Sequence, residues 1–126
     1  MATITHTIQS IASGIWVYTW TNLTTTNNVG DAVSTATFAD KSVEVLQSGT
    51  SATVVIEGSN QTSSPSYFTL RDPFSVALSF TGNGLSAITE NPYIIRPRIS
   101  SGGDGTTSIT VYLCVSTPTA YGLTPT

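Results

Sequence analysis

The chain has 126 residues and a mass of 13.2 kDa, which suits a single domain with its own hydrophobic core. Only 11 residues are charged, whereas 23 are Thr and 17 are Ser. The formal net charge of −3 provides no basic surface for nucleic acid. The apolar runs, none longer than five residues, are too short to cross a membrane, and the hydrophobic content of 39% argues against disorder.

No secretory signal is recognisable at the start of the sequence. Met1 is followed by ATITHTIQS, which has neither a basic region nor a long apolar run. We therefore expect the protein to be made, and to stay, in the cytoplasm of the cell that produces it. Because Cys114 is the only cysteine, we expect no intrachain disulfide and no multi-cysteine metal site.

β-branched and aromatic residues recur at every second position through most of the sequence, which is typical of β-strands. In chain order, the predicted strands cover residues near 3–8, then 14–21, near 33–38, 41–47, 52–58, 66–70, 76–81, 92–100 and 107–116. Turn residues separate these segments at the intervals expected of two packed sheets. The sequence therefore predicts an all-β fold, a single antiparallel β-sandwich of the jelly-roll or immunoglobulin-like kind with extended terminal arms.

The two ends of the chain fit the sandwich pattern less well. Isoleucines at positions 4, 8, 11 and 15 have helical spacing, but the threonines among them favour an extended strand over a short helix. We expect residues 1–12 to form an N-terminal strand or arm and residues 13–116 to form the sandwich domain. Prolines interrupt residues 117–126, so that segment is expected to be a C-terminal tail or an arm laid on a neighbour.

The strands predicted at 92–100 and 107–116 are separated by the glycine-rich segment Ser101–Gly105. Such a segment between two strands predicts a hairpin loop, and hence an antiparallel pair. Pro97 lies within the first of these strands and cannot donate a backbone hydrogen bond. Its presence predicts an edge strand or a β-bulge.

No arrangement of residues indicates an active site, a cofactor site or a metal site. His6 is the sole histidine and lies in the first ten residues, while Cys114 lies in a strand with no basic residue nearby in sequence. The seven acidic residues show no local signature of paired carboxylates or of a calcium loop. They are Asp31, Asp40, Glu44, Glu57, Asp72, Glu90 and Asp104. We expect a protein that is not an enzyme.

Trp16, Tyr18 and Trp20 form the first group of candidate binding residues. Their spacing in a strand places three aromatic rings on one face of a sheet. Such a row is consistent with a sandwich core, with a subunit interface, or with a platform that stacks on sugar rings.

Arg96 and Arg98 form the second group, on one strand face about 7 Å apart in a chain with only four basic residues. One interpretation is that they pair within the fold with Glu57, Glu90 or Asp72. The other is that they present two fixed guanidinium groups to a carboxylate on a partner.

Four stretches resemble the small head decoration, or capsid cement, proteins of tailed bacteriophages. They fall within about residues 40–116 and comprise Val54–Asn60, Phe68–Pro73, Ile88–Glu90 leading to Tyr93–Pro97, and Gly102–Val115. In that family a strand ending in Gly-Ser-Asn precedes an aromatic residue, a Tyr-x-Arg-Pro strand and a final hydrophobic strand. Here Gln61 stands where an acid is usual, and Tyr67 or Phe68 stands where Trp is frequent.

The resemblance implies a non-enzymatic β-sandwich that binds the major capsid protein on the outer surface of a phage head and stabilises it. It also implies a homotrimer, synthesised in the host cytoplasm and located on the exterior of the virion, without nucleic acid or membrane partners. The alternative is a carbohydrate-binding β-sandwich or a phage tail receptor-binding module, with the aromatic row at Trp16, Tyr18 and Trp20 as its platform.

Overall fold

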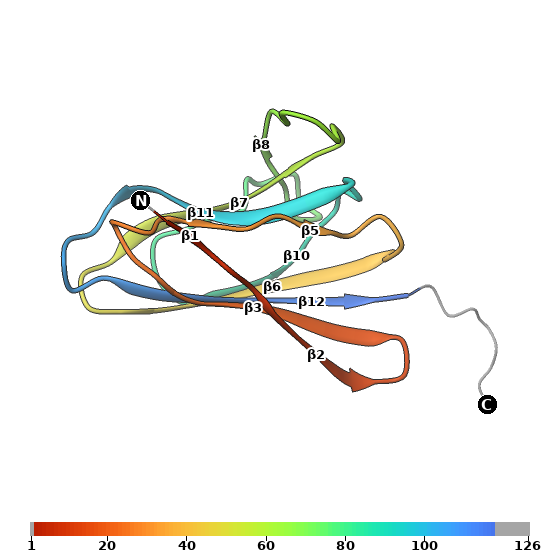
Figure 1. Cartoon of the computed structure of the whole chain (residues 1–126), viewed down its shortest axis with the longest axis horizontal. Helices are drawn as coiled ribbons and strands as arrows, with labels where there is room; N and C mark the ends of the chain where they lie inside the picture. Colours follow the sequence, from red (N-terminus) through yellow and green to blue (C-terminus); the bar gives the residue numbers. More distant parts are fainter. Residues whose placement is uncertain (1, 118–126) are drawn as a thin grey trace.

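The computed structural model describes residues 2–117, which form twelve β-strands and no helix. The strands make two sheets that face each other across a hydrophobic interior (Figure 1). The predicted all-β sandwich is confirmed. Within the described residues there is no helix long and apolar enough to span a membrane.

The first sheet, called sheet A below, has seven strands, which follow the order β1-β4-β11-β7-β8, with β5 beside β11 and β9 beside β7. Two of its strands are long and form its centre, and the other five are two-residue segments around them. Their bounds are β1 (Thr3–Ile4), β4 (Val29–Gly30), β5 (Val33–Ser34), β7 (Ala52–Ser59), β8 (Phe68–Thr69), β9 (Ser79–Phe80) and β11 (Ile94–Gly102).

The second sheet, called sheet B, has five strands in the order β10-β6-β12-β3-β2, and every pair in it is antiparallel. Their bounds are β2 (Thr7–Ala12), β3 (Ile15–Leu23), β6 (Asp40–Ser48), β10 (Gly84–Ala87) and β12 (Ser108–Ser116). Strand β2 is the outer edge of this sheet, and in Figure 1 it extends away from the body of the sandwich.

The N-terminal segment is extended, as predicted from its threonines, and it contributes to both sheets. β1 pairs with β4 and is the one parallel pair among the described strands, and β2 pairs with β3. The chain therefore crosses from sheet A to sheet B between Ile4 and Thr7. Of the predicted C-terminal tail or arm, residues 118–126 lie outside the described residues.

The hairpin predicted at Ser101–Gly105 is wrong. Strand β11 before this segment belongs to sheet A, and strand β12 after it belongs to sheet B. Gly102 and Gly103 adopt φ values of 78° and 83°, which non-glycine residues rarely adopt. A Cβ added at Gly103 would lie 2.7 Å from the Thr107 Oγ1 atom. The glycines thus let the chain turn tightly from one sheet to the other.

The edge position predicted for Pro97 is also wrong, because β11 has partners on both sides. β7 pairs along its length, while β4 pairs with Arg98 and β5 pairs with Ile94 and Ile95 on the other side. Pro97 falls in the gap between these two short strands, so its missing N–H group is tolerated inside the sheet. The β-bulge of this strand lies between Ile99 and Ser101.

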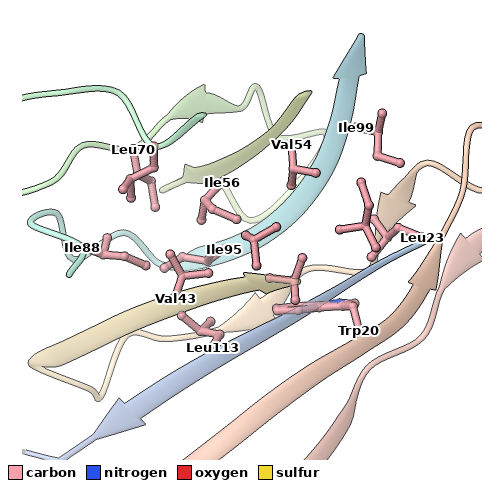
Figure 2. Packing of buried hydrophobic residues seen from close by; sticks show 14 of the residues in the cluster. Trp20, Leu23, Val43, Val54, Ile56, Leu70, Ile88, Ile95, Ile99 and Leu113 are labelled. Atoms are coloured by element: carbon pink, nitrogen blue, oxygen red, sulfur yellow. The ribbon is translucent and has the colours of Figure 1, made fainter. Parts of the chain in front are cut away.

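The core fills the space between the sheets with side chains from every long strand (Figure 2). On β12 the alternate residues Ile109, Val111, Leu113 and Val115 are all fully buried. They face residues of β7 and β11, among them Ile56 and Ile95. Alternation along β11 and β12 places one face of each of these strands inside the sandwich.

We expect Leu113→Ala to lower the free energy of unfolding by about 2–5 kcal/mol, because it leaves a cavity between the sheets. Leu113 is fully buried, whereas Leu85 on the edge strand β10 is 71% exposed. Leu85→Ala is therefore the matched control and should change the free energy of unfolding by less than about 0.5 kcal/mol. Urea denaturation of the two variants measures the difference, and equal losses would contradict this assignment of the core.

Candidate functional site

Arg96 and Arg98 lie on the outer face of sheet A, near the middle of β11. The strand alternates, so Ile95, Pro97 and Ile99 are buried while the two arginines are on the solvent side. In the register of β11 with β7, Arg96 is directly opposite Glu57. Strand pairing therefore brings one acid of β7 against both bases of β11.

The Glu57 carboxylate bridges the two guanidinium groups. Arg96 Nε donates to Glu57 Oε2 at 2.7 Å, and Arg98 Nε donates to Glu57 Oε1 at 3.1 Å. The Glu57 side chain is only 4% exposed, whereas those of Arg96 and Arg98 are 26% and 36% exposed. Of the acids considered from the sequence, namely Glu57, Glu90 and Asp72, Glu57 is the one that pairs with both arginines within the fold.

The bridge uses one nitrogen of each arginine. Within the described residues, the Nη groups of Arg96 and Arg98 make no hydrogen bond to the protein. An arginine has five N–H donors, so each retains several donors at the surface. The arrangement holds two guanidinium groups in fixed positions with a net charge of +1 over the three side chains.

Tyr67 completes this cluster from the connection between β7 and β8. The Arg96 Cζ atom lies 3.6 Å from the centre of the Tyr67 ring, in a cation–π contact. The sequence predicted a strand over 66–70 that includes Tyr67, whereas β8 begins only at Phe68. The contact of Tyr67 with Arg96 was not predicted, because periodicity does not reveal what a residue in an irregular connection faces. Its ring restricts Arg96 more than Arg98, for which no such contact occurs in the described part of the chain.

The aromatic row on β3 faces the interior of the sandwich. Trp20 is 1% exposed, and Trp16 and Tyr18 are half-buried and pack against the core cluster. The Trp16 ring lies 5.6 Å from that of Phe38. Trp20 is thus unable to stack on a ligand, so the three rings do not form a continuous exposed platform.

His6 has a carboxylate partner that the sequence did not suggest. Its Nδ1 atom lies 2.9 Å from Asp31 Oδ2, and its backbone N–H donates to Asp31 Oδ1 at 3.0 Å. The Trp20 Nε1 group donates to the same Oδ1 atom at 2.9 Å. The His6 ring also makes an edge contact with Tyr18, 5.4 Å between ring centres. This cluster therefore anchors the N-terminal segment to the sandwich.

Cys114 is half-buried on β12, opposite Ser42 of β6. It borders a cavity of about 410 Å³ that Lys41 also lines. The Lys41 ammonium donates to the Phe38 carbonyl and to Asn91 Oδ1. Burial lowers the pKa of Lys41, and the nearby Asp40 carboxylate acts in the opposite direction. Lys41 is therefore occupied by contacts within the fold.

Several of the acids bind backbone groups in turns. Asp72 Oδ1 accepts the N–H groups of Phe74 and Val76. Asp104 accepts from the Thr106 hydroxyl and N–H groups and from the Thr50 hydroxyl, and these hydrogen bonds lower its pKa. Across residues 2–117, no group of three or more His, Cys, Asp or Glu side chains could hold a metal ion.

No known family model matches the sequence, and neither does any curated protein. Among solved structures, the fold is similar to that of the SPBc2 prophage-derived protein YomS, with a TM-score of 0.58. The similarity covers 85% of this chain and 98% of YomS, at 14% sequence identity. The comparison shows that the two proteins share a fold.

We expect Glu57→Gln to lower the free energy of unfolding by about 1–3 kcal/mol, since two guanidinium groups lose their shared carboxylate while solvent still screens them in part. Arg96→Gln should cost more than Arg98→Gln, because Arg96 makes the shorter bond and also contacts Tyr67. Urea denaturation measures all three. Arg71→Gln, at an exposed position, is the control for the loss of one positive charge.

Equal costs for Arg96→Gln and Arg98→Gln, both no larger than that of Arg71→Gln, would contradict a structural role for the bridge.

Proposed function

We propose that this chain is a non-enzymatic structural protein of a tailed-phage virion that binds the outer surface of the capsid and stabilises it. The observation that carries the proposal is the pair of guanidinium groups that Glu57 and Tyr67 hold on the outer face of sheet A. The similarity in fold to a prophage-derived protein supports the phage context, and so does the sequence resemblance to decoration proteins.

A fixed guanidinium pair suits a protein interface for a physical reason. Long side chains normally lose conformational entropy when a partner immobilises them, and here much of that cost is met on folding. The free Nη donors match the geometry of a carboxylate on a neighbouring surface. The proposed partner is the major capsid protein, with an acidic side chain opposite Arg98, the more exposed of the two.

The rest of the surface favours many weak polar contacts over a few ionic ones. With 40 Ser and Thr residues against 11 charged ones, hydroxyl groups dominate the polar side chains. Hydroxyls hydrogen-bond to a partner with a smaller desolvation cost than charges. We propose that the protein is made in the host cytoplasm, acts on the virion exterior, and has neither a nucleic-acid nor a membrane partner.

The edge of sheet B supports self-association, for which we propose a homotrimer, with a dimer as the next alternative. All six residues of β2 are exposed, and none of them is charged or a proline. Soluble proteins usually protect exposed sheet edges with charged residues or prolines. An edge without them favours pairing with another strand. Ile8 and Ile11 add apolar side chains there, both 54% exposed. A symmetric oligomer would bring several arginine pairs to one capsid surface and add avidity.

We expect purified protein to bind undecorated phage heads at a fixed ratio to capsid subunits and to raise the temperature at which they disrupt. Arg98→Gln should weaken binding by about 2–5 kcal/mol if the guanidinium lies at a desolvated contact, mainly through faster dissociation. Sedimentation of heads with labelled protein gives the occupancy. Arg71→Gln is the matched control, since it removes the same charge elsewhere and should leave occupancy unchanged.

Absence of saturable binding to mature heads would refute capsid decoration. Equal weakening by Arg98→Gln and Arg71→Gln would show that net charge, and not the guanidinium held by Glu57, determines binding.

We expect native mass spectrometry at micromolar concentration to show a trimer. Ile8→Lys should shift the population towards monomer, because it places a charge on the exposed edge strand β2. Val76→Lys is the control, since Val76 is similarly exposed, at 58%, but lies outside the edge strand. A wild-type protein that is strictly monomeric would remove the avidity argument.

A further inference from the structure

An open groove lies at one end of the sandwich, where β7 ends and β8 begins beside the segment that precedes β11. Its volume is about 360 Å³, within the range of small-molecule sites. The groove does not include the arginine cluster or the aromatic row of β3. Its lining includes the side chains of Asn60, Gln61, Phe68, Glu90 and Asn91.

Hydrogen bonds within the fold orient the first two carboxamides of the groove. The backbone N–H of Tyr93 donates to Asn60 Oδ1 at 2.9 Å, and that of Ser66 donates to Gln61 Oε1 at 2.5 Å. Because an N–H group can pair only with the carbonyl side of an amide, the orientation of each carboxamide is determined. Asn60 and Gln61 therefore keep their NH₂ groups for a ligand.

Asn91 and Glu90, which also line the groove, are oriented in the same way. The Lys41 ammonium donates to Asn91 Oδ1, which leaves the Asn91 NH₂ group available. The backbone N–H of Arg71 donates to Glu90 Oε1 at 2.8 Å. Within the described residues, Glu90 Oε2 accepts no hydrogen bond. The groove thus offers three oriented amide donors and one carboxylate acceptor.

Phe68 supplies an apolar surface beside these polar groups. Its ring is 73% exposed although it lines the groove with Leu70 and Pro92, which are buried. Register places Phe68 opposite Gly58 of β7, where no side chain covers the ring. An aromatic side chain exposed to this extent gains free energy when a flat apolar surface covers it.

We propose that this groove binds a ring of a neutral carbohydrate. A pyranose has an apolar C–H face that fits the Phe68 ring, and hydroxyl groups that both accept from amide NH₂ groups and donate to a carboxylate. Glu90 is the only ionisable side chain that lines the groove in the described part of the chain. Its charge disfavours phosphate, sulfate and acidic sugars.

The proposal is independent of capsid binding, since neither Arg96 nor Arg98 contributes to the groove. It also differs from the platform predicted from the sequence, in which the ring of Trp20 is buried. Tryptophan fluorescence is therefore a poor probe of this site, and the test needs signals from the groove residues themselves.

The experiment is a titration of isotope-labelled full-length protein with glucose, galactose, mannose and N-acetylglucosamine, followed by amide chemical shifts. Linear oligomers of any sugar that binds then distinguish recognition of one ring from recognition of a polymer. We expect saturable shifts at the amide groups of the groove, including those of Asn60 and Phe68, for at least one sugar.

Two variants and one control make the test specific. Phe68→Ala should weaken binding about tenfold by removing the stacking surface. Asn60→Asp keeps the oxygen that accepts from Tyr93 but replaces the NH₂ donor, and should also weaken binding about tenfold. Phe74→Ala is the matched control, because its ring is 87% exposed and does not line the groove. It should leave the affinity unchanged.

Three outcomes would overturn the proposal. The first is that no sugar in the panel gives saturable shifts at the groove. The second is that Phe74→Ala weakens sugar binding as much as Phe68→Ala does. The third is that the groove binds an uncharged peptide but none of the sugars. Asn60→Asp is compared with wild type by thermal denaturation, so a loss of binding without a loss of stability supports a ligand role for the NH₂ group.

Discussion

The Trp20 indole lies where the two sheets and the start of the chain meet. Its ring belongs to sheet B and packs in the core, while its Nε1 group donates to both the carbonyl and the carboxylate of Asp31, between β4 and β5 of sheet A. The same carboxylate binds the backbone and ring of His6. The Trp20 side chain thus joins both sheets, and through Asp31 it is connected to the N-terminal segment at His6.

Gly30 shows how closely this junction is packed. A Cβ atom at Gly30 would lie 2.5 Å from Trp20 Cδ1 and 2.8 Å from Pro97 Cδ. The short strand β4 must therefore carry glycine here, because any larger side chain would displace the indole or the proline of β11. The arginine pair lies on either side of Pro97 along β11, so the position of the surface cluster depends on this packing within the sandwich.

The sequence was most informative where one face of a strand is buried along its whole length. Alternation correctly indicated β12 and β11, and it placed Arg96 and Arg98 on the face opposite Ile95 and Ile99. It failed for connections, because Gly102 and Gly103 permit a crossing between sheets as readily as a hairpin. Alternation within a strand contains no information about which sheet the next strand joins.

The candidate sites also differ in how far the sequence could predict them, and residues of regular strands were more predictable than those of connections. Glu57 was among the partners expected for the arginines. It lies on the outer face of β7, directly opposite Arg96 in the register of the two strands. Tyr67, Asp31 and the groove around Phe68 come from irregular segments whose contacts span many residues. The aromatic row on β3 has a spacing that fits a core and a platform equally well, and only the position of β3 inside sheet B distinguishes them.

The pairing of Arg96 and Arg98 with Glu57 affects both the charge and the geometry that a partner would meet. Glu57 neutralises half of its charge, and the chain as a whole carries −3. Long-range attraction to an acidic surface is therefore weak, and salt screens what remains beyond a distance of about 10 Å. Specificity would come from short-range geometry, namely donors already held at fixed positions when the surfaces meet. Rigid donors of this kind act mainly on the dissociation rate, which fits the proposed attachment to a capsid surface.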